Sequence, residues 1–295
     1  MSELVTILTP TYNRKKQLYN LFESLNKQIN KNFIWLIVDD GSTDGTEKII
    51  SDLKNRAEYK IEYISKSNGG KHTALNIGFQ QVSTKLVFIV DSDDILIENA
   101  VQKIYDNSYE LEKNNLAGIS FLRGYDENKI IGDVFPTKKS IYNGIDIQFR
   151  YKITGDKAEV WRSDILKQYQ FPVFDGEKFQ GENYIWWQIA RRYNMLYVNE
   201  IIYITKYLDG GLTLSGKKMR IKNPKGGMEN SRQAFYKEFP LKTRLKYSWL
   251  YDCYAFFDNK KPSEAIKESG NKFMTAMMMP LGYLLYKYWN VKYGD

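Results

Sequence analysis

The sequence predicts an α/β fold with a mostly parallel central sheet and a helical C-terminal region. Three observations support this. Short β-rich runs alternate with helix-like stretches over the first 125 residues, and the composition shifts near residue 215. The chain of 295 residues is 43% hydrophobic, enough to bury a sizeable core. We therefore expect one α/β domain over residues 1–215 and a basic, aromatic helical appendage over residues 216–295.

The β-rich runs define the expected strands in order: LVTILT (4–9), FIWLIVD (33–39), KIEYIS (60–65), KLVFIVD (85–91) and LAGISFL (116–122). Helix-like stretches separate them, at about 15–27, 44–56, 71–82 and 98–113. Such alternation is typical of a parallel sheet with helices on both faces. Farther along, ENYIWWQIARRY (182–193) predicts a helix and MLYVNEIIYI (195–204) a strand.

Polar residues follow four of the expected strands: TPTYNR (9–14), DDGSTD (39–44), SKSNGGK (65–71) and DSDD (91–94). In an open α/β sheet, ligands bind beyond the carboxyl ends of the strands, so these segments predict one pocket. The pocket is acidic, and clustered carboxylates repel one another unless a positive group lies among them. Oxygen ligands of this kind suit Mg²⁺ or Mn²⁺ bridging to a phosphate, and Lys71 after two glycines suits an anion.

The C-terminal region is basic. Residues 217–246 contain ten Lys and Arg against two Glu, an excess equal to the formal net charge of +8 of the whole chain. This predicts an anionic partner, either a membrane or a nucleic acid. The uncharged stretch FMTAMMMPLGYLLY (273–286) would span only ~21 Å as a helix, short of the ~30 Å hydrocarbon core. We expect Pro280 and Gly282 to interrupt this helix. We therefore expect the stretch to be an interfacial segment or a helix packed on the domain, and not a membrane span.

Together these motifs resemble the inverting glycosyltransferases of family 2, which have the GT-A fold. The resemblance covers about residues 3–215 and rests on TPTYNR, VDDGSTDGT (38–46), NGGKHTALNIG (68–78) and VDSDD (90–94), in this order. The stretches GEKFQGE (176–182), NYIWWQIA and KYLDGGLT (206–213) look like a bacterial branch that builds capsular or other surface polysaccharides. The resemblance implies a Rossmann-like nucleotide-diphospho-sugar transferase fold.

The resemblance also implies nucleotide-binding roles. Pro10, Tyr12 and Asp39 would hold the uracil and ribose of a UDP-sugar. Asp40, at the same strand end, would support this contact. Lys71 would face the base or the diphosphate.

Sugar, metal and acceptor roles follow in the same way. Asp91 would position the ribose or sugar, and Asp93 would ligate Mn²⁺ or Mg²⁺, with Asp94 behind it. Glu182, before the aromatic helix, would be the general base that deprotonates the acceptor hydroxyl. Many relatives carry Glu-Asp here, with the Asp as base, whereas this chain has Glu182-Asn183.

Several of these motifs also have a purely structural interpretation. Glu182 could simply favour a helix N-terminus through the macrodipole, and Glu177 and Asp175 are alternative bases. Trp187 is expected in the core, and Cys253 is expected to be structural. An acidic turn alone is more often a helix cap than a metal site.

The resemblance implies a UDP-sugar-dependent hexosyltransferase, with a lipid-linked oligosaccharide as acceptor. We expect a cytoplasmic protein, peripheral on the inner face of the cell membrane and bound to its anionic surface. The N-terminus reads as a strand and not a signal peptide, and the single cysteine fits a reducing compartment.

Three other functions compete with this one. A catalytically weak or silent membrane-docked scaffold is the main alternative, because of Asn183. A nucleotidyltransferase usually carries an early glycine-rich basic loop, which TPTYNR is not. A nucleic-acid binder is the third, but no nucleic-acid partner is expected, because the basic run matches no recognised module. An NAD-binding domain is not indicated, because no G-x-G-x-x-G follows the first strand. The donor sugar and the oligomeric state are not readable from the sequence.

Overall fold

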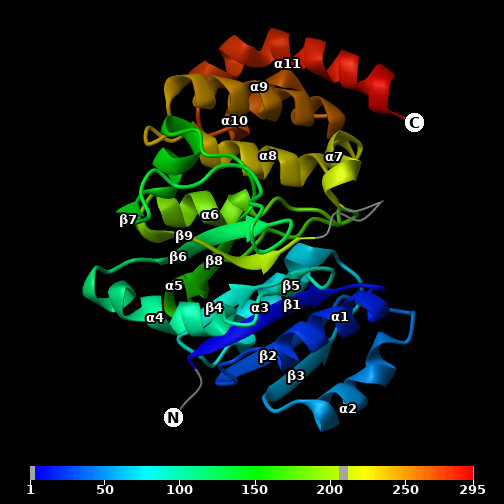
Figure 1. Ribbon diagram of the computed structural model, residues 1–295. Coiled ribbons are helices and arrows are strands. Elements are labelled where there is room, and N and C mark those ends of the chain that lie inside the picture. The colour runs from blue at the N-terminus through cyan, green and yellow to red at the C-terminus, as the bar shows by residue number, and fades with distance from the viewer. Residues whose placement is uncertain (1–3, 206–211, 295) are drawn as a thin grey trace. The chain divides into compact units, whose positions relative to one another are not determined.

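A computed structural model describes residues 4–205 and 212–294 of the chain (Figure 1). The chain forms two compact units. The first contains Met1–Gln170 and Arg192–Lys206, and the second contains Phe171–Arg191 and Tyr207–Asp295. The segment Phe171–Arg191 thus packs with the C-terminal helices, although the sequence groups it with the α/β domain. The functional division at residue 215 stays a prediction.

The first unit is built on one nine-stranded sheet, with the order β3-β2-β1-β4-β8-β6-β9-β5 and with β7 on β9. The N-terminal strands are parallel, as predicted: β1 (Val5–Thr11), β2 (Phe33–Asp39), β3 (Lys60–Ser65) and β4 (Leu86–Ile89). The others are β5 (Ile95–Leu96), β6 (Gly118–Gly124), β7 (Lys139–Tyr142), β8 (Lys157–Arg162) and β9 (Met195–Ile204).

Strand β8 makes the sheet mixed, because it runs antiparallel to both β4 and β6. Strands β6 and β9 are parallel to each other, while β5 and β7 are antiparallel to β9. The sequence did not indicate β5, β7 or β8, since these runs are short and lie among loop residues. The predicted α/β class holds, with its parallel part confined to β1–β4 and the β6–β9 pair.

Four longer helices alternate with these strands: α1 (Lys15–Asn26), α2 (Thr46–Arg56), α3 (Lys71–Gln81) and α4 (Ala100–Lys113). Each lies within two residues of its predicted start. Helix α1 shows why they dock: Leu18, Leu21, Phe22 and Leu25 are all fully buried, at the spacing of one helix face. They join Trp35 of β2 in the main core. The unit also contains a π-helical turn η1 (Asp146–Arg150) and a short helix α5 (Ser163–Leu166).

The second unit is helical. Its elements are α6 (Asn183–Ala190), α7 (Leu212–Ile221), α8 (Pro224–Arg232), the 3₁₀ turn η2 (Gln233–Phe235), α9 (Leu241–Phe257), α10 (Pro262–Glu268) and α11 (Lys272–Tyr293). A separate core of Met228, Phe235, Tyr251, Tyr254 and Trp289 holds it together. Of the motif KYLDGGLT, residues 206–211 lie outside the described part of the chain. None of the helices in the described part is both long enough and apolar enough to cross a membrane.

Helix α11 corrects one expectation. The sequence predicts an interruption at Pro280 and Gly282, but the helix continues through both. The glycine is explained by packing: a Cβ at position 282 would lie 2.3 Å from the Cβ of Asp252 on α9. The indole of Trp249 donates to the carbonyl of Leu281, at 2.7 Å. Close packing on α9 therefore supports a helix that the local sequence disfavours.

Candidate active site

The register of the parallel strands brings their carboxyl ends to one edge of the sheet. Thr11 lies opposite Asp39, and Asp39 lies opposite Ser65. Between β1 and β4 the paired residues end at Leu8 and Ile89, where the amide of Val90 donates to the carbonyl of Leu8 at 3.0 Å. Strand order reverses at β1, because β2 and β3 lie on one side of it and β4 on the other. Ligands of open α/β sheets bind at such switch points.

The predicted nucleotide residues of β1 lie at this edge. Pro10 is the penultimate residue of β1 and is buried, opposite Val38. Tyr12 follows the strand, and 47% of its surface is exposed. The next residue, Asn13, ties this turn to the loop after β2, because its side-chain oxygen accepts from the amide of Thr43 at 2.7 Å. An exposed aromatic ring beside a buried strand end is available for stacking on a base.

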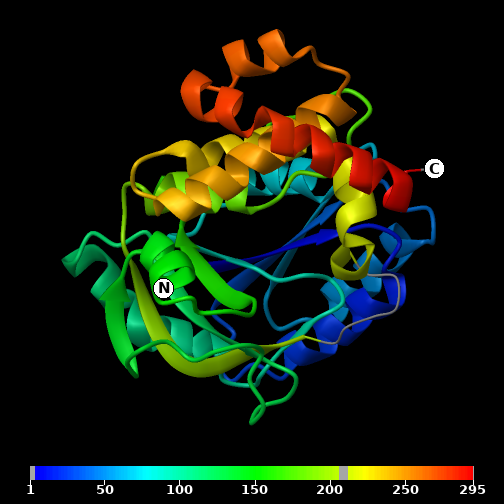
Figure 2. The same cartoon turned by 90° about the horizontal axis from the view of Figure 1, so that it is seen from above.

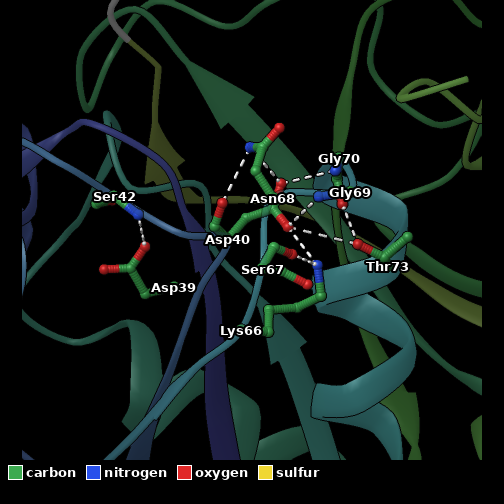
Figure 3. A network of polar contacts seen from close by, with 9 residues as sticks. All are labelled: Asp39, Asp40, Ser42, Lys66, Ser67, Asn68, Gly69, Gly70 and Thr73. Carbon is green, nitrogen blue, oxygen red and sulfur yellow. Dashed lines mark hydrogen bonds and ion pairs between the residues drawn. The ribbon is translucent and has the colours of Figure 1, made fainter. Parts of the chain in front are cut away.

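Asp39 is the last residue of β2 and is only 1% exposed. One carboxylate oxygen accepts from the amide of Ser42 at 2.8 Å (Figure 3), and the other accepts from the hydroxyl of Tyr63 at 2.8 Å. These bonds hold Asp39 in one orientation. Tyr63 is a partner that the sequence did not identify.

Asp40 organises the loop before α3 (Figure 3). Its carboxylate accepts from the amides of Gly69 and Gly70, at 2.9 and 2.7 Å. It also accepts from the Asn68 amide group at 3.0 Å and from Lys66 Nζ at 2.5 Å. A carboxylate has about four acceptor sites, so Asp40 is fully engaged within the protein. Its predicted support for nucleotide binding stays a prediction, and any such support acts through this loop.

Gly41 makes this arrangement possible. Its φ is +81°, and a Cβ there would lie 2.9 Å from the amide nitrogen of Asn68. Only glycine adopts that conformation at little cost. The β2 loop and the Asn68 loop can therefore lie against each other.

Lys71 and Asp91 form an ion pair, with Nζ 2.6 Å from Oδ1. Lys71 is the first residue of α3, and Asp91 follows β4. Burial opposes the charged form of Asp91, but Lys71 and Arg123 outweigh it and hold the pKa of Asp91 below its ordinary value. The structure thus brings together two residues that the sequence places at separate strand ends.

Arg123 and Tyr203 contact the acidic loop that follows β4, and the sequence did not identify either residue. The guanidinium of Arg123 lies 4.0 Å from the ring centroid of Tyr203 and 3.9 Å from an oxygen of Asp94. The Tyr203 hydroxyl accepts from the amide of Asp91 at 3.0 Å. Burial, together with the charge of Asp91, raises the pKa of Asp94 to about 7. Because both residues lie within strands β6 and β9, no local motif marks them.

Asp93 differs from its neighbours. In the part of the chain that the structure describes, no protein group donates a hydrogen bond to its half-buried carboxylate. That part also holds no group of three or more His, Cys, Asp or Glu side chains placed for a metal. Mg²⁺ commonly takes one or two carboxylates, with phosphate oxygens and water completing its shell. An uncommitted oxygen donor beside a predicted diphosphate site fits a cation of this kind.

Glu182 lies in the second unit, at the residue before α6. It is half-buried, and its carbonyl accepts from the amides of Ile185 and Trp186, at 3.0 and 3.2 Å. Glu177 has a structural role instead: its carboxylate accepts from the amides of Lys225 and Gly226, at 2.8 and 2.9 Å, at the first turn of α8. This contact disfavours Glu177 as the base.

Two further expectations concern structural residues, Trp187 and Cys253. Trp187 is 2% exposed and packs against Phe239 and Tyr247, with ring centroids 5.5 and 5.0 Å away. Cys253 is fully buried in α9. His72 is buried in α3, and burial lowers its pKa. The expectation that Trp187 is a core residue is confirmed, and the burial of Cys253 and His72 fits structural roles.

The site has the features of a nucleotide-sugar transferase, and comparison with known proteins agrees. The sequence model of "Glycosyl transferase family 2" matches residues 6–175, more than half of the chain. The chain belongs to this family. The recognition drawn from the four strand-end motifs is therefore confirmed.

Two curated relatives illustrate the similarity. Glycosyltransferase GlyG of Streptococcus pneumoniae serotype 4 is 33% identical over 129 residues, which is 43% of this chain and 42% of that protein. The Escherichia coli protein WfgD is described as a UDP-Glc:alpha-D-GlcNAc-diphosphoundecaprenol beta-1,3-glucosyltransferase. It is 28% identical over 223 residues, which is 74% of this chain and 81% of WfgD. The chain spans less than half the length of the first curated relatives it matches.

Solved structures support the fold. TarS residues 1–349 of S. aureus, crystallised with UDP-GlcNAc, has a TM-score of 0.59 at 16% identity, covering 98% of this chain and 92% of that one. The mannosyltransferase PcManGT of Pyrobaculum calidifontis, solved with GDP-Man and Mn²⁺, has a TM-score of 0.57 at 14% identity. That similarity covers 100% of this chain and 88% of PcManGT. These similarities confirm the predicted GT-A fold.

Proposed function

We propose that this protein is a metal-dependent inverting glycosyltransferase that moves a hexose from a UDP-sugar to a lipid-linked glycan at the inner face of the cell membrane. The observation that carries the proposal is the switch-point edge of the sheet, where Asp39 ends β2, Lys71 pairs with Asp91, and no described protein group donates a hydrogen bond to Asp93. The similarity to WfgD supports a UDP-sugar donor and a diphosphoundecaprenol-linked acceptor.

The donor site follows from the residues at the edge. Asp39, held by Ser42 and Tyr63, would accept hydrogen bonds from the uridine, and the exposed ring of Tyr12 would stack on its base. Lys71 stands at the N-terminus of α3, where lysine and helix dipole both favour a phosphate. When the donor binds, the Lys71 ammonium would exchange its contact with Asp91 for one with the diphosphate.

The chemistry is a single displacement at the anomeric carbon. Glu182 would take the proton from the acceptor hydroxyl as that oxygen attacks, a role that contributes roughly 10²–10⁴-fold in rate. The bond to the UDP oxygen breaks as the new glycosidic bond forms, which inverts the configuration. Asp93 would hold a divalent cation, and that cation, when bound, supplies positive charge to the leaving diphosphate.

The test is UDP release from a panel of UDP-sugars with Mn²⁺ and a lipid-linked acceptor. Glu182→Gln should lower turnover at least about a hundredfold without weakening UDP binding. Asp93→Asn should abolish the dependence of UDP binding on Mn²⁺. Glu127→Gln, on an exposed loop, is the matched control and should behave as wild type.

Asn183 keeps one other function open, a weak or silent scaffold of a polysaccharide assembly complex. Asn183→Asp restores the residue pair that many relatives carry. If the wild type binds UDP but releases none from any donor, and Asn183→Asp gains turnover, the scaffold function is correct and the proposed activity is wrong.

A further inference from the structure

One face of helix α11 is apolar and exposed along its whole length. Seven large apolar side chains of this helix are exposed, among them Phe273 at 81%, Leu284 at 63% and Val291 at 88%. Six of them recur every three or four residues, and we call them the α11 stripe: Phe273, Met277, Leu281, Leu284, Tyr288 and Val291. At 3.6 residues per turn, the stripe occupies an arc of about 80° and runs for about 27 Å.

The opposite face of α11 already has its partner. Met274, Gly282 and Trp289 are buried, and the ring of Trp289 lies 6.0 Å from that of Tyr254 on α9. Helices α9 and α11 lie side by side in both views (Figures 1 and 2). Packing within the unit therefore accounts for the inner face only. A globular helix needs one apolar face, and this one has two.

Positive charge borders the stripe. Helix α11 contains Lys272, Lys287 and Lys292 and no Asp or Glu. By helical periodicity, Lys287 lies on one side of the stripe and Lys292 on the other. The Nζ of Lys287 is 5.4 Å from the ring centroid of Tyr283, and that of Lys292 is 5.6 Å from that of Tyr288. Long cationic side chains beside tyrosine rings are typical of helices that lie in a membrane interface.

We propose that the α11 stripe is a docking surface for an anionic lipid bilayer, on which α11 lies flat. The proposal deepens the membrane association in the proposed function by assigning it to one helix face. Apolar side chains would enter the acyl boundary, and the lysines would contact lipid phosphates. A second copy of this chain fits less well, because facing stripes would bring together four lysines, Lys287 and Lys292 of each copy, with no carboxylate on either helix to pair with them.

The test is sedimentation of the full chain with vesicles of phosphatidylcholine alone or mixed with phosphatidylglycerol. The wild type should bind the anionic vesicles at least about tenfold more tightly. Leu284→Ser with Val291→Ser should weaken that binding at least about tenfold, since both side chains leave the acyl region. Lys287→Gln and Lys292→Gln should each weaken it about fivefold, and added salt should reduce the difference.

Matched controls are Tyr109→Ser with Val173→Ser, which remove apolar side chains that are 63% and 59% exposed outside α11. These should bind as wild type, and all variants should unfold at the wild-type temperature. The proposal would be overturned if the stripe variant and the control variant bound anionic vesicles equally well. It would also be overturned if the wild type did not bind anionic vesicles. If the wild type is a dimer that does not bind vesicles, and the Leu284→Ser, Val291→Ser variant is a monomer, the stripe is instead the contact with a second copy of this chain.

UDP release measured without vesicles separates this inference from the proposed function. Vesicle binding without UDP release would support the docking surface and contradict the proposed glycosyltransferase activity. UDP release without vesicle binding would do the reverse.

Discussion

Asp252 gives the sharpest stability prediction for this chain. It lies on α9 directly beneath Gly282 of α11, and no part of it is exposed. Among the described residues, neither of its carboxylate oxygens has a hydrogen-bond partner. Ser248 and Thr275 are also fully buried, with hydroxyls that lack one. A carboxylate in such surroundings favours its neutral form, and burial raises the pKa of Asp252 from 3.8 to about 8.

The sign of the pH dependence follows from that pKa. Between pH 4 and 8, the folded chain keeps a proton on Asp252 that the unfolded chain has lost. Unfolding therefore releases a proton, and the free energy of unfolding falls as pH rises, by about 1.4 kcal/mol per pH unit. Between pH 5.5 and pH 7.5 the expected loss is about 3 kcal/mol. Above pH 8 this contribution no longer changes.

The perturbation is Asp252→Asn, which keeps the shape and removes the ionisation. The free energy of unfolding of the variant should rise relative to wild type by about 3 kcal/mol between pH 5.5 and pH 7.5. Urea unfolding followed by tryptophan fluorescence measures it, and other titrating groups cancel because both proteins share them. Asp156→Asn, at an exposed aspartate, is the control and should keep a constant offset. An offset for Asp252→Asn that does not vary with pH would refute this reasoning.

Three further predictions concern the site and its supports. Asp40→Asn should cost about 2–3 kcal/mol in urea unfolding and weaken UDP binding, because the amides of Gly69 and Gly70 lose an ionised acceptor; unchanged UDP affinity would contradict a role through this loop. Arg123→Met should lower stability by about 3–5 kcal/mol in thermal unfolding, since the guanidinium offsets the charge of Asp91 and lies 3.9 Å from the buried Asp94, and Arg123→Lys should recover part of it. Glu177→Gln should cost about 1 kcal/mol, because the first turn of α8 keeps only a neutral acceptor, and should leave turnover near wild type in the UDP-release assay; a hundredfold loss would make Glu177 the base instead.

The strand ends of the site could be predicted because they depend on local signals. Apolar runs predict β1 to β4, and parallel pairing then brings Thr11, Asp39 and Ser65 to the same edge whatever the rest of the fold does. Lys71 and Asp91 meet for the same reason. The helices α1 to α4 follow from the periodicity of their buried residues.

The supporting residues could not be predicted, because their roles depend on long-range packing. Arg123 and Tyr203 are separated by eighty positions and meet the acidic loop only because β6 and β9 are paired. Strand β8, inserted antiparallel between β4 and β6, has no signal of its own in the sequence. Likewise, nothing local marks Asp252 as protonated, since its burial depends on Gly282 thirty positions later.

The partners of the other carboxylates support the proposal that Asp93 is the residue that would hold a cation. Asp40 is neutralised by Lys66 and satisfied by backbone amides, and Asp91 is neutralised by Lys71 and Arg123. Burial and the charge of Asp91 raise the pKa of Asp94 to about 7, and the guanidinium of Arg123 lies 3.9 Å from one of its oxygens. Each of these groups thus has its charge compensated within the protein, whereas Asp93 keeps oxygen donors that no described protein group uses. A metal that arrives with a charged ligand could bind Asp93 directly. At any of the other carboxylates it would first have to displace a protein group that already contacts the carboxylate.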